Sequence, residues 1–469
     1  MMNLLQAMNT TATTDNGCVA NHSSLSKCVD FFYLSGASRG KDIKKEFIAA
    51  LVENEDVALR TLQWLRDVRE GAGERQLFRD LTKVAVEQLG TSHSGIIQLI
   101  AKIPELGRFD DLIWLNENCL EIGDFACHVY KDQLKENNGL AFKWCPIKGN
   151  SAKKLRNMLG FKKEADWRKY IVAGRKTVEQ QMCAKEWNEI DFSKVPSLAS
   201  ARYQKAFGRN AQEKYVKYLE ALVKGETKIN ASAVYPYDVI KSVKQGNKDI
   251  ANQQWKALPN YLEGNKERIL PVIDVSGSMS CPAGKNSSVS CMDVAISLGL
   301  YVAEHNDGIF KDIFMTFHST PQLCKVSGTL SQKIAQIIGA PWGMNTDLQK
   351  VFITLLQAAV ANKVPESEMP TTIIFFSDMQ FDNCVTNSHN VSAYTMIDTL
   401  YSENGYNRPN IVFWNLNASN KSIPVTIGTE GTALVSGFSP SLMKSLLNGG
   451  LEPETTMLSV VMNNRYSLQ

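Results

Sequence analysis

The chain has 469 residues, more than one ordinary hydrophobic core accommodates, so two or three domains are expected. Hydrophobic residues make up 44% and charged residues 21% of the chain, which is the composition of a soluble globular protein. No stretch approaches the roughly 18 uncharged apolar residues that span a bilayer, so no membrane anchor is expected. Residues 1–21 lack the basic start and apolar core of a secretory signal, so a cytoplasmic location is expected.

The net charge of +3 is unevenly divided along the chain. Residues 266–469 contain 12 Lys and Arg against 16 Asp and Glu, whereas residues 1–265 contain 39 against 32. The basic first part permits contact with a polyanion, although the same excess can be a solvated surface. The ten cysteines include no Cys-x-x-Cys pair, which indicates reduced thiols rather than a disulfide framework or a zinc site.

Helices are expected to dominate residues 25–265, after a flexible N-terminus over residues 1–24. Up to Leu222 apolar residues recur at helical spacing, and short breaks such as Glu70-Gly71-Ala72-Gly73 separate the helices as in stacked helical hairpins. No exact repeat is present, so the pattern supports a regular solenoid only in part. A connection to the next domain is predicted over residues 235–267.

From residue 268 onward, short β-rich runs alternate with helix-like segments. The predicted strands are 269–273, 313–317, 371–376 and 410–414, and the predicted helices are 292–305, 348–362 and 392–402. Pro271 lies inside the first strand and has no backbone N–H, so it must occupy a position where no hydrogen bond to a neighbouring strand is needed. The alternation predicts a parallel, doubly wound sheet in residues 266–469, with any ligand site at the carboxyl ends of its strands. The predicted fold class is therefore α + α/β.

Oxygen-bearing side chains follow the first predicted strand at every second position. Asp274, Ser276 and Ser278 lie on a glycine-containing loop and can converge on one point. Asp378 follows the third predicted strand, and Thr346 precedes the helix at 348–362. Mg²⁺ prefers about six oxygen ligands and keeps some waters, so this set predicts a site for Mg²⁺ or another divalent cation. Because Asp, Ser and Gly also form turns, an ordinary turn is the alternative interpretation of the loop alone.

These five positions resemble the metal-ion-dependent adhesion site of von Willebrand factor A domains, whose pattern is Asp-x-Ser-x-Ser, then a Thr, then an Asp. The resemblance implies a Rossmann-like fold for residues 266–469. It also implies direct coordination by the hydroxyls of Ser276, Ser278 and Thr346, with Asp274 and Asp378 binding directly or through water. In that family the cation usually leaves one coordination position for a partner's carboxylate, so its role is binding rather than chemistry.

The sequence predicts no enzyme. His318 and His389 follow predicted strand ends, but each is interpreted as a satisfied or solvent-exposed histidine. Gly284-Lys285-Asn286 does not complete a phosphate-binding loop, because Met279 stands where the first glycine is needed and Asn286 where Ser or Thr is needed. A cation-dependent hydrolase is disfavoured because no base is paired with the site.

Charged residues are densest between Arg66 and Arg79, where the arginines can pair with phosphates or with the interleaved acids. This segment and residues 103–112 resemble the helical-repeat (HEAT-like) half of the Ro autoantigen, or TROVE, family of RNA-binding proteins. In that family a von Willebrand A domain closes a ring of helical repeats. Other stretches, including Phe142-Lys143-Trp144 and residues 187–197, resemble a related uncharacterised family with the same two-part layout.

The TROVE resemblance implies an RNA-binding, non-catalytic ribonucleoprotein scaffold that holds single-stranded RNA ends or a small structured RNA. Lysines and arginines would neutralise phosphates, so affinity would fall steeply with salt, although each can instead be a solvated surface charge. The candidate RNA-binding residues are Lys41, Lys44, Lys45, Arg69, Arg75, Lys153, Lys154 and Arg156. The alternative function is a protein-interaction adaptor in which the cation captures an acidic residue of a partner.

Overall fold

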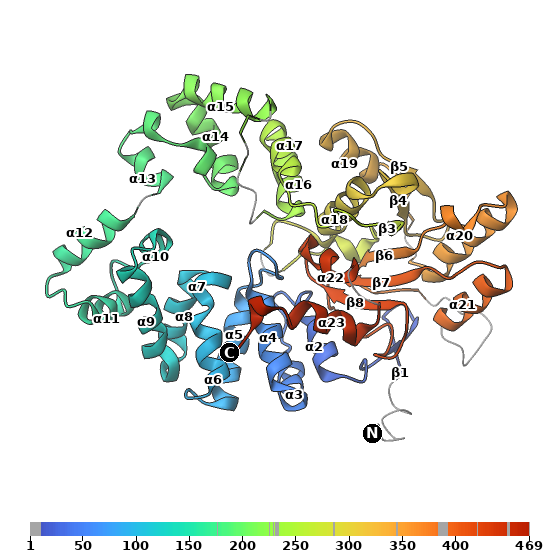
Figure 1. Cartoon of the computed structure of the whole chain (residues 1–469), viewed down its shortest axis with the longest axis horizontal. Helices are drawn as coiled ribbons and strands as arrows, with labels where there is room; N and C mark the ends of the chain where they lie inside the picture. Colours follow the sequence, from blue (N-terminus) through green and yellow to red (C-terminus); the bar gives the residue numbers. More distant parts are fainter. Residues whose placement is uncertain are drawn as a thin grey trace. The chain divides into compact units, whose positions relative to one another are not determined.

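The contacts between residues divide the chain into two compact units. We define the sheet unit as Met1–Ala58 with Tyr235–Asn464, and the helical unit as Leu59–Val234 with Arg465–Gln469. The computed structural model (Figure 1) describes residues 11–175, 177–224, 226–227, 229, 234–284, 287–343, 346–382, 393–419, 421–447 and 451–468. Within these segments, no helix combines the length and the apolar character needed to cross a bilayer.

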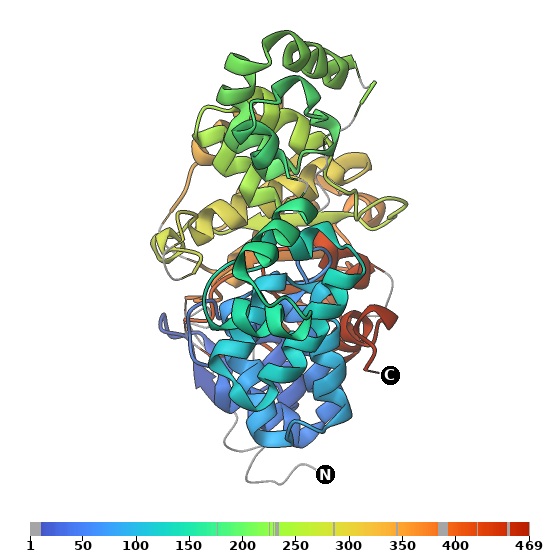
Figure 2. The ribbon, with the colours of Figure 1, turned by 90° about the vertical axis from the view of Figure 1, so that its left-hand side faces the viewer.

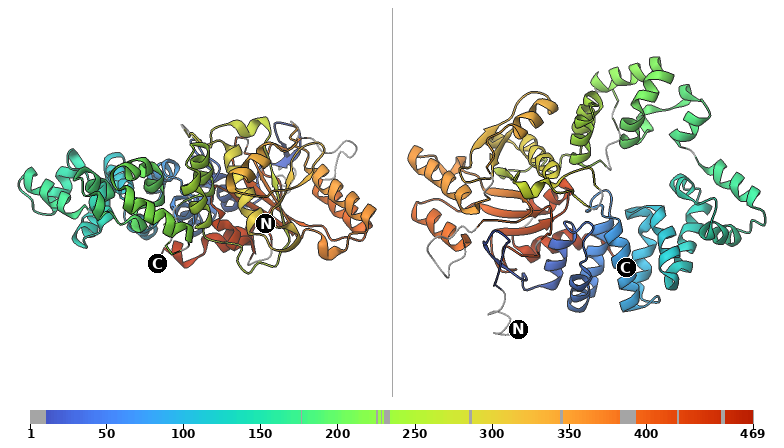
Figure 3. Two further views of the ribbon diagram at one scale, coloured as in Figure 1. Left: turned by 90° about the horizontal axis from the view of Figure 1, so that it is seen from above. Right: turned by 180° about the vertical axis from the view of Figure 1, so that it is seen from behind.

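A six-stranded sheet forms the core of the sheet unit (Figure 3). Its strands are β3 (Ile269–Ile273), β4 (Ile313–Thr316), β5 (Leu323–Lys325), β6 (Thr372–Ser377), β7 (Asn410–Asn415) and β8 (Thr432–Ser436). They lie in the order β5-β4-β3-β6-β7-β8, with β5 antiparallel to β4 and every other pair parallel. The predicted parallel sheet with intervening helices is confirmed, and each of the four predicted strands agrees to within one residue at either end. The short edge strand β5 and the buried strand β8 were not predicted.

Pro271 occupies the middle of β3, opposite Ile374 of β6. The N–H of Asp274 donates to the carbonyl of Phe376 on β6, so the backbone nitrogen three residues earlier faces the other neighbour, β4. The pairing of β3 with β4 begins only at Val272. The missing N–H of Pro271 therefore falls before that ladder starts, as the sequence required.

Ten helices lie wholly within the described part of the sheet unit. They are α2 (Lys27–Ser35), α3 (Lys44–Glu53), α16 (Pro236–Lys244), α17 (Lys248–Lys256), α18 (Cys291–His305), α19 (Leu330–Ile338), α20 (Leu348–Asn362), α21 (Ala393–Glu403), α22 (Met443–Leu447) and α23 (Pro453–Val461). Helix α18 packs on β3 and β4, and an added Cβ at Gly299 would lie 2.5 Å from the side chain of Ile273. Helices α2 and α23 pack against β8. The segment 235–267, predicted as a connection, contains α16 and α17.

The first described residues form a hairpin in which β1 (Thr11–Thr13) pairs antiparallel with β2 (Val19–Asn21). The first ten positions of the predicted flexible N-terminus, residues 1–24, lie outside the described residues. After the hairpin, α2 and α3 belong to the sheet unit, so the contact-based division differs from the sequence-based boundary at residues 265 and 266. The reason is apolar packing, because α2 buries Phe31 and Phe32 completely and contacts β8.

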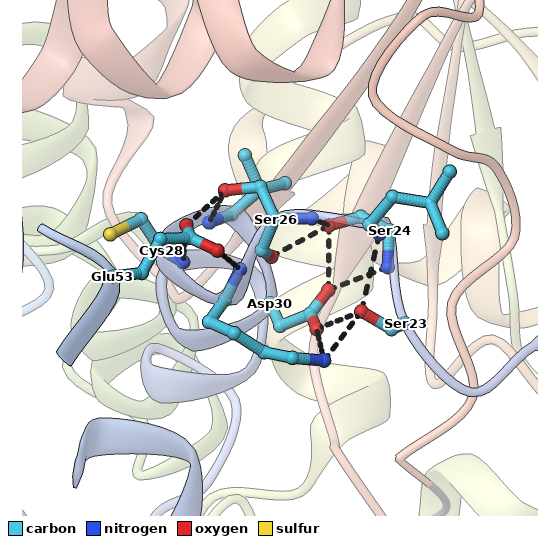
Figure 4. A network of polar contacts seen from close by, with 9 residues as sticks. Ser23, Ser24, Ser26, Cys28, Asp30 and Glu53 are labelled. Carbon is cyan, nitrogen blue, oxygen red and sulfur yellow. Dashed lines mark hydrogen bonds and ion pairs between the residues drawn. The ribbon is translucent and has the colours of Figure 1, made fainter. Parts of the chain in front are cut away.

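Helix α2 begins in a network of polar side chains that Figure 4 shows. The carboxylate of Glu53 accepts the backbone N–H groups of Lys27 at 2.8 Å and Cys28 at 3.0 Å. Asp30, in the first turn, accepts both the backbone N–H and the hydroxyl of Ser24 at 2.6 Å. The first N–H groups of a helix have no partner within it, so Glu53 satisfies two of them, while Asp30 binds the segment that precedes α2.

The helical unit confirms the predicted helical character of the first half (Figure 2). Its helices are α4 (Glu55–Arg66, which starts in the sheet unit), α5 (Gln76–Leu89), α6 (Ser94–Ala101), α7 (Ile103–Leu106), α8 (Phe109–Asn118), α9 (Leu120–Lys135), α10 (Gly139–Trp144), α11 (Asn150–Met158), α12 (Glu164–Gly174), α13 (Val178–Cys183), α14 (Ser197–Asn210) and α15 (Gln212–Lys224). Short 3₁₀ helices add η1 (Trp187–Glu189), η2 (Phe192–Lys194) and η7 (Asn464–Tyr466, which starts in the sheet unit) here, and η3 (Gly277–Ser280), η4 (Gly308–Phe310), η5 (Glu366–Glu368) and η6 (Pro440–Leu442) in the sheet unit.

A buried ion network joins α4, α5 and α8. The carboxylate of Asp111 is fully buried and accepts from Nε of Arg66 and Nε of Arg79, both at 2.8 Å. The backbone N–H of Arg108 adds a third bond at 3.0 Å. Of the two interpretations of the Arg66–Arg79 segment, internal pairing therefore holds for these two arginines. Removing the carboxylate of Asp111 would leave the buried guanidinium groups of Arg66 and Arg79 without this negatively charged partner.

We predict that Asp111→Ala destabilises the helical unit by about 3–5 kcal/mol, because it breaks a buried ionic network. Asp132→Ala is the matched control, since Asp132 on α9 is 61% exposed and pairs with its neighbour Lys131 at 3.7 Å. Its cost should be below about 1 kcal/mol. Hydrogen exchange of peptides from α4, α5 and α8 in the full-length protein measures both effects. Equal protection in the two variants would show that the network is not stabilising.

Candidate cation site

The candidate site lies where the strand order of the sheet reverses. Along the chain, β4 is added on one side of β3, whereas β6, β7 and β8 are added on the other side. The reversal falls between β3 and β6, and ligands of open α/β sheets bind at the carboxyl ends of the strands at such a point. Asp274 directly follows β3 and Asp378 directly follows β6, and the two strands pair with Ile273 opposite Phe376. The fold therefore brings both predicted carboxylates to this point.

Asp274 is held by hydrogen bonds on both of its oxygens. Oδ1 accepts the backbone N–H of Ser276 at 2.9 Å, and Oδ2 accepts the hydroxyl of Ser377 at 2.5 Å. The Ser276 hydroxyl lies 3.1 Å from that of Ser278, and the Ser278 side chain interacts with the carboxylate of Asp378. Four of the five predicted cation ligands are thus joined in one network, together with Ser377, which was not predicted.

Burial dominates the electrostatics of the two carboxylates. Asp274 is completely buried, and this burial, followed by the charge of Asp378, raises the pKa of Asp274 from 3.8 to about 6. Burial also raises the pKa of Asp378, while the hydrogen bond from Ser278 acts in the opposite direction. Two like charges that are held close together with little water are costly. A divalent cation would remove that cost.

Lys41 lies beside this network and not on an open surface. Its ammonium group donates to Oδ1 of Asn417, which follows β7, and its charge lowers the pKa of Asp378. Partial burial lowers the pKa of Lys41 itself. The segment leading to Lys41 crosses the carboxyl ends of β7 and β8, where Gly36 N–H donates to the Ser436 hydroxyl at 3.1 Å. Lys41, predicted as an RNA contact, is therefore part of the surroundings of the candidate cation site.

Thr346 forms hydrogen bonds with the segment that follows Asp378. Its hydroxyl donates to the carbonyl of Gln380 at 2.7 Å, and its N–H donates to Oδ2 of Asp382 at 2.6 Å. Thr346 is 3% exposed, and residues 344–345 before it lie outside the described residues. In this structure its hydroxyl is thus linked to Gln380, whereas the hydroxyls of the serine loop are linked to each other and to Asp378.

The predicted histidines and the rejected phosphate loop lie partly outside the described residues. His318 follows the end of β4, and its Nδ1 accepts the N–H of Thr320 at 3.3 Å. Burial lowers the pKa of His318. His389, Lys285 and Asn286 belong to segments that the structure does not describe.

The donor set fits a hard cation. Two carboxylates and two or three hydroxyls are oxygen donors of the kind that Mg²⁺ prefers, and several waters would complete about six ligands. The described segments contain no group of three His, Cys, Asp or Glu side chains placed to hold a metal ion. A site here would therefore depend on the serine hydroxyls. Ser278 is exposed while both carboxylates are buried, so the serine loop forms the side of the site that faces solvent.

Most of the predicted RNA-binding residues form contacts within the protein. Arg69 donates to the carbonyl of Glu105, Arg75 pairs with Asp110 at 3.3 Å, Lys154 pairs with Asp124 and Arg156 pairs with Glu164 at 3.5 Å. Lys44, Lys45 and Lys153 are exposed. Lys45 also lines a cavity of about 720 Å³ in the sheet unit, together with His22, Lys27 and Lys421.

A larger basic segment lies in the helical unit, and the sequence reasoning identified only part of it. Residues 148–176 contain ten Lys and Arg and only two Asp and Glu. The exposed members of this segment include Lys162 and Lys163, between α11 and α12, and Arg168 and Lys169 on α12. Counting charge in a short window would have found them.

The regions that match known protein families meet between residues 267 and 268, where the sequence pattern changes from helices to alternating strands and helices. Residues 268–466 match a domain of unknown function (DUF7788), and residues 148–267 match another domain of unknown function (DUF2828). An uncharacterized protein of Acanthamoeba polyphaga mimivirus is 30% identical over 506 aligned positions. The alignment covers 96% of this chain and 86% of the viral protein, so the similarity extends over both parts.

We predict that Asp274→Asn stabilises the cation-free protein at neutral pH. The pKa of about 6 lies above the ordinary 3.8, so the wild-type carboxyl contributes stability that is present below pH 4 and lost as the pH rises through 6. Between pH 4 and pH 7.5 the wild type should lose about 3 kcal/mol relative to the variant. Denaturant unfolding in EDTA measures this difference.

The control is Asp312→Asn, because Asp312 pairs with Lys333 at the opposite end of β4. If the free energies of unfolding of Asp274→Asn and the wild type changed with pH in the same way, the prediction would be wrong.

Proposed function

The chain belongs to the same family as the mimivirus protein, and on that premise we propose that it is a non-enzymatic, divalent-cation-dependent binding protein. The sheet unit is then a von Willebrand A domain whose site holds a divalent cation, with Mg²⁺ preferred. That cation would bind an acidic group of a partner. The observation that carries the proposal is the burial of Asp274 and Asp378 together at the switch point of the sheet, within one network with Ser276 and Ser278.

Three features of the site support cation-dependent binding. The strand order places the site where open α/β sheets bind ligands. The charge of Asp378 raises the cost of ionising the buried Asp274, which a bound cation would offset. Ser278 is exposed, so an oxygen atom of a partner can approach the loop from solvent. We propose no catalytic role, because among the described residues the loop hydroxyls interact with each other and with Asp378 rather than with a histidine.

We predict that Asp378→Ala and Asp274→Ala each weaken Mn²⁺ binding to the full-length protein by more than about tenfold, because each removes a charged oxygen donor. Electron paramagnetic resonance of free Mn²⁺ measures the affinity, and competition with Mg²⁺ and Ca²⁺ ranks the cations. Asp312→Asn serves again as the control and should bind like the wild type. Unchanged affinity in both alanine variants would reject the site.

RNA binding is the second candidate function, and the basic segment 148–176 is the observation that favours it. Exposed lysines and arginines on and between two helices are suited to neutralising successive phosphates. The order of the two parts, helical then α/β, also resembles that of the Ro family, where the helical HEAT-like part binds RNA. In this proposal α11 and α12 carry the contact, and the paired residues Arg75 and Lys154 contribute less.

We predict that replacing Lys162, Lys163 and Lys169 together by alanine reduces the affinity for single-stranded RNA. The slope of log affinity against log salt concentration should fall by about 0.7 for each phosphate contact that is lost. Filter binding at several salt concentrations measures it, with Lys311→Ala in the sheet unit as the control. Protein purified from its native cell without nuclease, followed by sequencing of bound RNA, identifies the ligand. If the purified protein carried no RNA, and if its affinity for added RNA did not change with salt concentration, only the cation-dependent function would remain.

A further inference from the structure

Two cysteines face each other directly after the candidate cation loop. Cys281 follows η3 and Cys291 is the first residue of α18, and their sulfur atoms lie 3.5 Å apart. The backbone aligns them, because the N–H of Cys291 donates to the carbonyl of Cys281 at 3.0 Å. An antiparallel bridge between Pro282 and Ser290 continues the pairing. The approach of the two thiols thus rests on paired backbone as well as on side-chain orientation.

The surroundings of the two sulfurs differ in a way that suits stepwise oxidation. Cys281 is partly exposed, whereas Cys291 is 1% exposed. The side-chain amide of Asn417 donates to the Cys281 sulfur at 3.1 Å. The thiol of Cys291 points to the carbonyl of Leu416 at 3.7 Å. An oxidant from solvent therefore reaches Cys281 first, and Cys291 is already in place as the second thiol.

We propose that Cys281 and Cys291 form a reversible intramolecular disulfide. The two sulfurs need to approach from 3.5 Å to about 2 Å, a shift that rotation of the two side chains can provide. The bond would join the residue after the cation loop to the first turn of α18. This proposal does not rest on the proposed function, because the thiols can react whether or not a cation binds.

The oxidation uses hydrogen peroxide as the two-electron oxidant. The thiolate of Cys281 attacks one peroxide oxygen, the O–O bond breaks, and with one proton taken up the products are a sulfenic acid and one water. The thiol of Cys291 then loses its proton and attacks the sulfenic sulfur, which forms the S–S bond and releases the hydroxyl group as a second water. A small dithiol reverses the reaction by exchange and is itself oxidised to its cyclic disulfide.

The test is peptide mapping of the full-length protein after treatment with hydrogen peroxide and blocking of the remaining thiols. Trypsin cleaves after Lys285, so the two cysteines fall on separate peptides, 269–285 and 286–311, each with no other cysteine. We expect these two peptides to be recovered as one cross-linked species that dithiothreitol separates. The exposed Cys183 reports that the oxidant was active.

Two serine variants make the result specific. In Cys281→Ser the cross-linked species should disappear. Cys291 should stay reduced, because its burial shields it from the oxidant, and it should be blocked once the treated protein is unfolded. In Cys183→Ser the cross-link should form as in the wild type. The proposal is overturned if wild-type Cys183 is oxidised while peptides 269–285 and 286–311 stay separate. It is also overturned if the cross-link forms only after the protein is denatured.

Discussion

The burial of two carboxylates at one point is the constraint on which the sheet unit depends. Asp274 and Asp378 are held at the ends of adjacent parallel strands, where burial and the charge of Asp378 raise the cost of ionising Asp274. The protein offsets this cost with hydroxyl and backbone donors and with the ammonium group of Lys41. That ammonium group is itself partly buried. Such an arrangement is poor for stability alone and is typical of a site that serves a ligand.

The sequence predicted those parts of the fold that depend on local pattern. Buried parallel strands are continuous apolar runs, so β3, β4, β6 and β7 were predicted nearly to the residue. The meeting of Asp274 and Asp378 followed from their positions after two such runs. Lys41 could not be assigned in the same way, because its partner Asn417 lies 376 positions further along the chain. The edge strand β5 has only three residues, too few to display a period.

The basic residues show a different limit. Charge can be read from the sequence, but pairing cannot, and Arg66, Arg75, Arg79 and Arg156 all form ion pairs in the structure. Asp111 binds two of them in the interior, so part of the positive charge of the helical unit stabilises the fold. The charge that is left for a polyanion concentrates in residues 148–176, where acids are too few to neutralise it.

The hydrogen bond between Gly36 and Ser436 has a consequence for synthesis, because 400 positions separate its partners. Ribosomes add about 5–20 residues per second, so helix α2 leaves the ribosome roughly 20–80 s before strand β8 exists. During that interval Phe31 and Phe32, which are completely buried in the finished protein, have no sheet to cover them. The nascent chain is therefore expected to present an exposed apolar helix to chaperones, and the sheet unit closes only near the end of translation.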